Sequence, residues 1–96
     1  MCTMIVTKAD ISGSGKGQQG WFKLSQANVS FDHPFHAPLE HALNIDFVNE
    51  AEGPGARVAV ELSAESARKL VEAILAALAQ GEASGYLVAT ESTLRR

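Results

Sequence analysis

The residues with the clearest capacity for chemistry in this sequence lie in one short segment. It holds all three histidines of the chain, and acidic residues flank it. Imidazole and carboxylate groups are the ligands that proteins offer to zinc, iron, copper and manganese. The segment therefore predicts a site for one of these divalent transition metals, or for a small polar ligand. The predicted metal ligands are His33, His36, His41 and Glu40, and the other flanking carboxylates are Asp32 and Asp46.

The spacing within this segment restricts such a site. His33 and His36 flank a turn containing Pro34, so both rings can point the same way. Glu40 and His41 are adjacent in an extended stretch, so they point to opposite faces and need a bend to share a metal. In the alternative interpretation, the first two histidines decorate a loop rim and His41 makes one hydrogen bond at the end of its strand.

The only cysteine of the chain, Cys2, is a candidate nucleophile. Removal of Met1 would expose an α-amine beside the thiol, which is the arrangement of self-activating N-terminal nucleophiles. A small buried apolar residue is the alternative role for this cysteine. We take Cys2 and the carboxylate Asp46 as the candidate catalytic residues, and whether the chain is an enzyme stays open.

The glycine-rich stretch Gly13 to Gly17 has two interpretations. Its backbone amides together with Lys16 could cradle a phosphate. It lacks the Gly-Lys-Ser/Thr ending of a nucleotide-binding loop, however, and the chain after it is typical of a strand. We therefore predict a flexible hairpin loop that extends to Gly20.

Four segments have the alternation or the β-branched composition of strands. They are residues 3–11, 21–31, 41–48 and 57–62. A bulge is expected near Ser25 to Asn28. The last two segments flank a short turn at Glu52 to Gly55, so we expect them to pair as a hairpin.

Apolar residues recur at helical spacing from Ala67 to Leu78 and predict one long helix. Ser63 is its expected N-cap and Gly81 its expected stop. We expect residues 1–81 to form one domain. Residues 82–96, with Tyr86-Leu87-Val88, form an edge strand, an exchanged arm or a tail.

These elements predict an α+β fold, with a mostly antiparallel sheet of about four strands and the C-terminal helix packed on one face. The opposite face carries Asn44, Asp46, Arg57 and Glu61 among small apolar residues. Such a face can stay in water, meet a second copy in a homodimer, or line a polar pocket. Within it, we expect Arg57 to pair with Asp46 or Glu61.

Composition narrows the class of protein. Hydrophobic residues make up 46% and charged residues 20%, as in folded globular chains. A net charge of −3 with eight Lys and Arg leaves no basic patch, so we expect no nucleic-acid binding. We find no membrane span and no signal peptide in the sequence. With a single cysteine, these features predict a cytoplasmic protein.

Several short motifs together resemble one protein family. They are Met1-Cys2-Thr3, Gly13 to Gly17 with Gly20-Trp21-Phe22, Asp32-His33-Pro34, Glu40-His41, Asn44 to Phe47 and Arg57 to Leu62. Over residues 1–81 the chain resembles a family of short, uncharacterised bacterial proteins found largely in actinobacteria. The resemblance implies a bacterial origin and a self-standing domain. Separately, the first three residues are similar to the start of bile-salt hydrolases and penicillin V acylases, which implies a nucleophilic Cys2.

Two hypotheses about function follow. The preferred one is a homodimeric domain whose histidine and carboxylate site binds a transition metal or a small polar ligand. The alternative is a non-catalytic module that binds another protein through the helix-free sheet face and the C-terminal tail.

Overall fold

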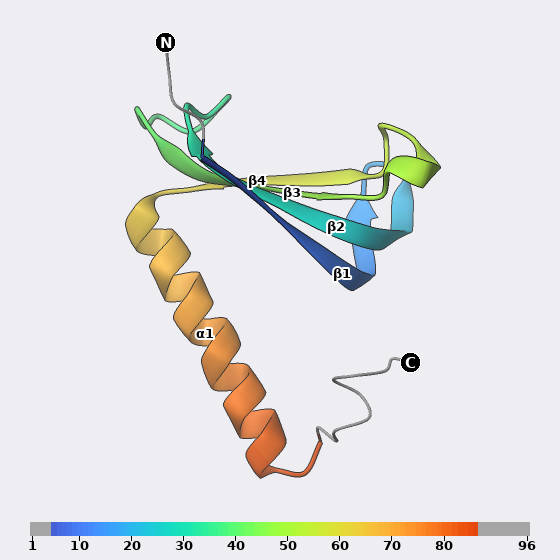
Figure 1. The fold of residues 1–96 in the computed structure, drawn as a ribbon, viewed down its shortest axis with the longest axis vertical. Helices are drawn as coiled ribbons and strands as arrows, with labels where there is room; N and C mark the ends of the chain where they lie inside the picture. Colours follow the sequence, from blue (N-terminus) through green and yellow to red (C-terminus); the bar gives the residue numbers. More distant parts are fainter. Residues whose placement is uncertain (1–4, 87–96) are drawn as a thin grey trace. The chain divides into compact units, whose positions relative to one another are not determined.

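The computed structural model of the chain describes residues 5–86. Four strands precede one long helix, and they form a single antiparallel sheet in the order β1-β2-β3-β4 (Figure 1). This confirms the predicted α+β class. The elements are β1 (Ile5–Gly17), β2 (Gly20–Asp32), β3 (Ala42–Val48), the short 3-10 helix η1 (Glu50–Glu52), β4 (Arg57–Leu62) and α1 (Ala64–Ala83).

The strand register gives the sheet two sides of different character, because residues paired across a ladder point to the same side. We call them the apolar side and the polar side. The apolar side carries Ile5, Ala9, Ala27, Val29, Phe31, Leu43, Ile45, Phe47, Val58, Val60 and Leu62. The polar side carries Lys8, Gln26, Asn28, Ser30, Asn44, Asp46, Arg57 and Glu61, with a few small or β-branched residues between them.

The first hairpin corrects the prediction of a flexible glycine loop. β1 continues through the glycines to Gly17, which pairs with Gly20 across a two-residue turn. Ladder hydrogen bonds to β2 therefore override the low strand propensity of glycine. The bulge also lies in β1, because two of its residues, Ile11 and Ser12, stand opposite Ser25 alone.

The glycine-rich end of this hairpin, residues 13–24, bends away from the rest of the sheet (Figure 1). A bulge increases local bending and twist, which accounts for the change of direction. The bend brings Gly17 close to β4: a Cβ atom there would lie 3.4 Å from the carbonyl oxygen of Arg57 and 3.2 Å from Cε1 of Phe22. A glycine at this position allows the close approach.

Asn49 ties the connection between β3 and β4 to the sheet. It is 8% exposed, and its Oδ1 accepts the N–H of Ala51 at 3.1 Å. Its Nδ2 donates to the carbonyl of Lys23 at 2.9 Å and to the carboxylate of Glu52 at 3.3 Å. The two strands pair as a hairpin, as predicted.

Helix α1 continues through Gly81 and ends at Ala83. The prediction that the helix stops at Gly81 is therefore wrong. Gly85 then takes a positive φ of 81°. Its N–H donates to the carbonyl of Glu82 at 3.1 Å, and the N–H of Tyr86 donates to that of Gly81 at 2.9 Å. This is a Schellman motif with Gly85 in the left-handed position. Leu87 and Val88 of the predicted tail segment lie outside the described residues.

The residues of 5–86 that are buried are small or polar. The buried residues are Ala27, Ala42, Ala56 and Asn49, and no large side chain in this part of the chain is fully buried. Helix α1 has no buried residue. The large side chains of its apolar stripe are all exposed, with Leu70 the least exposed at 42% and Leu75 the most at 60%. The packing of this helix on the sheet, and the single domain over residues 1–81, stay predictions.

None of the helices in the described part of the chain is both long and apolar enough to cross a membrane.

Candidate functional site

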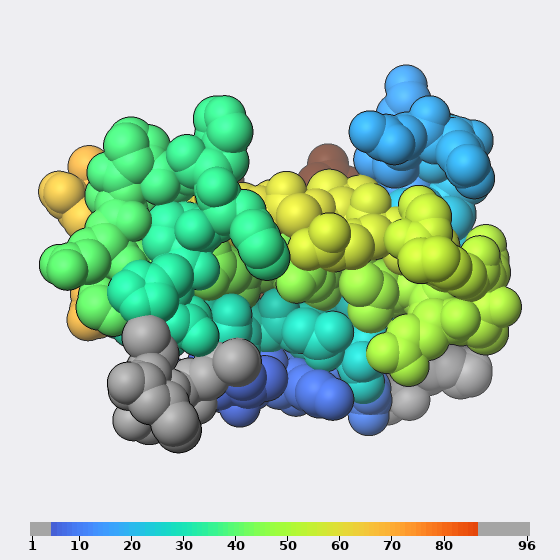
Figure 2. Space-filling view, turned by 90° about the horizontal axis from the view of Figure 1, so that it is seen from above, coloured from blue at the N-terminus to red at the C-terminus, as the bar shows by residue number. Residues whose placement is uncertain are grey.

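The polar side of the sheet is bounded at one end by the histidine loop, which we define as residues 33–41. β2 ends at Asp32, since Pro34 has no N–H for a ladder, and the chain returns to the sheet at Ala42. The bent hairpin end lies at the opposite end of the polar side. Figure 2 shows the loop in green and the hairpin end in blue at either end of the β4 surface in yellow.

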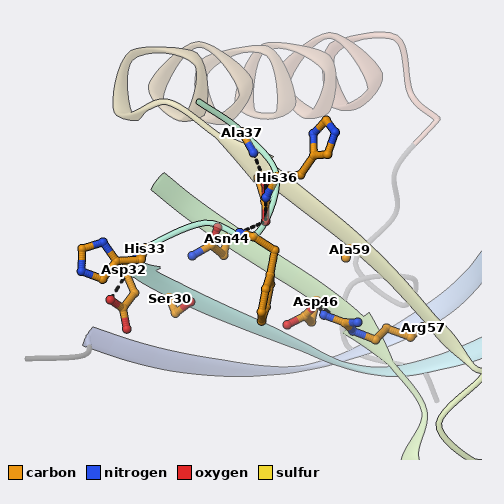
Figure 3. Close-up of a pocket in the computed structure, with 11 residues that line it drawn as sticks. Ser30, Asp32, His33, His36, Ala37, Asn44, Asp46, Arg57 and Ala59 are labelled. Atoms are coloured by element: carbon orange, nitrogen blue, oxygen red, sulfur yellow. Dashed lines mark hydrogen bonds and ion pairs between the residues drawn. The ribbon is translucent and has the colours of Figure 1, made fainter. Parts of the chain in front are cut away.

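Glu61 of β4 holds the histidine loop in place. Its carboxylate accepts three consecutive backbone N–H groups: Phe35 at 2.6 Å, His36 at 3.0 Å and Ala37 at 2.8 Å. Figure 3 draws these bonds beside Ala37 and His36 of the loop. Three converging N–H dipoles form an anion-binding nest. The side chain of Glu61 is therefore a built-in anion that fixes the loop.

These bonds also set the acidity of Glu61. The N–H groups of Ala37 and Phe35 stabilise the carboxylate and hold the pKa of Glu61 below its usual value, with smaller help from the N–H and the charge of His36. Partial burial acts in the opposite direction and does not cancel them. Glu61 is thus ionised at neutral pH, and its carboxylate is occupied by the three backbone N–H groups of the loop.

Two of the histidines form an aromatic stack at the end of the sheet. The rings of His33 and His41 lie 4.9 Å apart at 25°, and His41 stacks on Phe31 at 5.9 Å and 13°. Nδ1 of His33 lies 2.7 Å from the carbonyl oxygen of Glu40. A carbonyl oxygen only accepts, so Nδ1 carries the proton. The loop is thereby closed by its own side chains.

An ion pair crosses the floor of the polar side. Arg57 donates from Nη2 at 2.6 Å and from Nε at 3.0 Å to the same oxygen of Asp46, Oδ1. The Arg57 side chain is 48% exposed and that of Asp46 is 34% exposed. This confirms the predicted pairing of Arg57 and selects Asp46 over Glu61 as the partner.

Between the histidine loop and this ion pair lies a pocket of about 740 Å³. Figure 3 shows Ser30, Asn44 and Asp46 on its floor, with Arg57 at the side away from the loop. A second hollow of about 520 Å³ adjoins it toward the hairpin end, where Lys16 and Gly17 line it. The two hollows share Arg57 and Ala59, and we call them together the polar trough.

The floor of the trough includes a polar atom without a partner. Oδ1 of Asn44 is buried and makes no hydrogen bond within the described residues, and the same holds for Oδ1 of Asn28 on the same side of the sheet. A buried acceptor without a hydrogen bond costs roughly 1–3 kcal/mol. A bound molecule that donates to Asn44 would recover this cost.

Residues 1–87 match the model of a protein family described as a family of unknown function, DUF6295. The chain belongs to this family. The match confirms the resemblance to an uncharacterised family and carries no activity with it. No curated protein and no solved structure matches the chain.

The structure separates the predicted metal ligands of this family member. Figure 3 shows the rings of His33 and His36 on different sides of the loop, and His33 and His41 are stacked, so their in-plane nitrogen lone pairs do not converge. Within residues 5–86 no group of three or more His, Cys, Asp or Glu side chains is placed to hold a metal ion. Metal binding by His33, His36, His41 and Glu40 stays a prediction that these contacts do not favour.

The two candidate catalytic residues have different outcomes. Cys2 lies outside the described residues. Asp46 is held by Arg57, which donates two charge-assisted hydrogen bonds to its Oδ1. A catalytic role for either residue stays a prediction.

The role of Glu61 in holding the histidine loop could not be predicted from the sequence. Glu61 and residues 35–37 are 24 to 26 positions apart, and no spacing rule connects them. A Glu on the polar side of β4 was the only available signal.

Proposed function

We propose that this chain is a non-catalytic interaction module that pairs with a second copy of itself through the apolar side of its sheet. The observation that carries the proposal is the strand register, which places nearly all the large apolar side chains of β3 and β4 on the apolar side, with Val48 as the exception. A sheet face of this composition needs a second layer, because apolar area left in water forfeits roughly 25 cal/mol per Å².

The connection between β4 and α1 favours a second copy as that layer. It consists of the single residue Ser63, between Leu62 and Ala64. Strand-to-helix connections usually take two to six residues. Short hinges favour the exchange of an element between identical chains. The apolar stripe of α1 has the character needed to cover such a sheet in the partner.

The association differs from the one expected from sequence, where the helix-free face was the candidate interface. In the structure, that face corresponds to the polar side, with its ion pair and latched loop. Charged residues are depleted at the core of protein interfaces. The apolar side is therefore the better candidate for pairing, and the polar side is free for another use.

A matched pair of variants tests the proposal by sedimentation analysis. Ile5 and Val6 are neighbours in the edge strand β1, are 60% and 47% exposed, and point to the apolar and the polar side respectively. We expect Ile5→Glu to shift the protein toward monomer and Val6→Glu to leave its mass unchanged. Equal behaviour of the two variants, or a wild-type monomer, would refute pairing through the apolar side.

A further inference from the structure

The pocket beside the histidine loop has the size of a small-molecule site. Its volume of about 740 Å³ lies within the roughly 300–1,000 Å³ typical of ligand pockets. The proposed association uses the opposite side of the sheet and leaves this pocket open. Its chemistry can therefore be considered separately.

Hydrogen-bond acceptors gather on the part of the pocket near the histidine loop. Oδ1 of Asn44 is buried without a partner in the described residues. Asp32 also lines the pocket, and one of its oxygens, Oδ1, accepts the N–H of His33 at 2.7 Å. Within residues 5–86 its other oxygen accepts no hydrogen bond, so a ligand can donate to it. These acceptors suit an ammonium group, which brings three N–H donors and a positive charge.

Hydrogen-bond donors occupy the part of the trough toward the hairpin end. Arg57 uses Nε and Nη2 on Asp46, so its third nitrogen, Nη1, can bind a carboxylate of a ligand. Lys16 lines the adjoining hollow and adds a second positive charge. The trough therefore offers acceptors near the histidine loop and free donors toward the hairpin end.

The pocket also offers an aromatic ring. Phe35 lines it and is 98% exposed, although its backbone N–H is fixed by Glu61. An exposed ring on a latched loop is a surface that the apolar part of a ligand would cover.

We propose that the polar trough binds a free amino acid or a similarly small zwitterion. Its ammonium group would bind Asn44 and Asp32, its carboxylate would bind Arg57, and its side chain would lie against Phe35. The charges of such a ligand match both ends of the trough, whereas a simple anion would bring no donor for Asn44 and Asp32.

Titration of the full chain with three related probes tests this proposal. The probes are L-phenylalanine, 2-phenylethylamine, which lacks the carboxylate, and 3-phenylpropionate, which lacks the ammonium group. We expect saturable binding of L-phenylalanine by calorimetry, and binding about tenfold or more weaker for each analogue. Amide NMR signals of Asn44 and Phe35 should shift during the titration. Absence of saturation up to about 10 mM, or equal affinity for an analogue, would overturn the proposal.

Two variants locate the site, with a third as control. Arg57→Gln should weaken L-phenylalanine and leave 2-phenylethylamine unchanged, while Asn44→Leu should weaken both. Lys69→Gln on α1, outside the trough, should bind as the wild type does. Folded Arg57→Gln and Asn44→Leu proteins that bind L-phenylalanine with wild-type affinity would refute the assigned contacts. If a variant fails to fold, the series of probes on the wild-type chain still decides.

Discussion

The two sides of the sheet are made by alternate residues of the same strands, yet they are completed in different ways. The polar side is completed by the chain itself, because Glu61 holds the histidine loop and Arg57 holds Asp46. The apolar side presents side chains such as Phe31, Val60 and Leu62, and no large side chain in residues 5–86 is fully buried. Hydrogen bonds thus organise the polar side, whereas we propose that a second copy of the chain covers the apolar side.

The largest effect should come from a charge on the apolar side. Val60 and Ala59 are neighbours in β4 and point to opposite sides. We expect Val60→Glu to lower the free energy of unfolding by about 2–3 kcal/mol, because the charge would be buried on association. Ala59→Glu should change it by less than about 0.5 kcal/mol. Urea denaturation measures both, and equal losses would show that the two sides do not differ.

The next largest effect concerns the latch of the polar side. Glu61→Gln removes the charge that three backbone N–H groups share, so we expect their hydrogen exchange to accelerate by about tenfold. Glu40→Gln, within the same loop, is the control and should leave exchange at residues 35–37 unchanged. Unchanged protection in Glu61→Gln would mean that the loop is fixed by other contacts.

The same latch makes the polar side sensitive to acid. Because the pKa of Glu61 is lowered in the folded chain, its contribution to stability is complete above the usual glutamate pKa. That contribution is lost as the pH falls through the lowered pKa. The difference between the urea midpoints of the wild type and Glu61→Gln should therefore be largest at pH 7 and shrink as the pH falls through the lowered pKa. A difference that stays constant over this range would contradict the lowered pKa.

A smaller effect is expected at the hairpin end of the trough. A Cβ atom at Gly17 would meet Phe22 and the backbone of Arg57, whereas one at Gly13 would meet nothing within 4 Å. We expect Gly17→Ala to destabilise the chain by about 1 kcal/mol, and Gly13→Ala to be neutral or slightly stabilising. Thermal denaturation compares the two. Equal melting temperatures would show that the hairpin end is not held against β4.

The smallest effect should follow loss of the ion pair. Asp46→Asn removes one partner of a half-exposed pair, which typically contributes about 0.2–1 kcal/mol. The loss should shrink further at high salt, because exposed charges are screened. If urea denaturation shows that Asp46→Asn lowers the free energy of unfolding by more than about 1 kcal/mol at any salt concentration, the ion pair has a larger structural role.

Regular spacing explains what could be predicted from the sequence. Alternation along 57–62 gave the bounds of β4 and the side to which each residue points, and helical spacing gave most of α1. The prediction of a flexible hairpin loop was wrong. Glycine composition suggests flexibility, whereas pairing with β2 keeps Gly13 to Gly17 in a strand. The stop at Gly81 was wrong because a helix tolerates a glycine, and the left-handed turn falls at Gly85.

The site was harder to predict than the fold. The histidines were found from their clustering, but their ring directions depend on how residues 33–41 close, and closure depends on Glu61 far away in the sequence. The pairing of Arg57 was foreseen because both partners lie on one side of neighbouring strands. Contacts between sequentially distant loop and strand residues leave no such pattern.

The solution mass of the unmodified chain, from size-exclusion chromatography with light scattering, tests pairing through the apolar side most directly. If two copies pair in this way, the chain forms a species of twice its 10.2 kDa mass at micromolar concentration. A single species of 10.2 kDa under these conditions would contradict it.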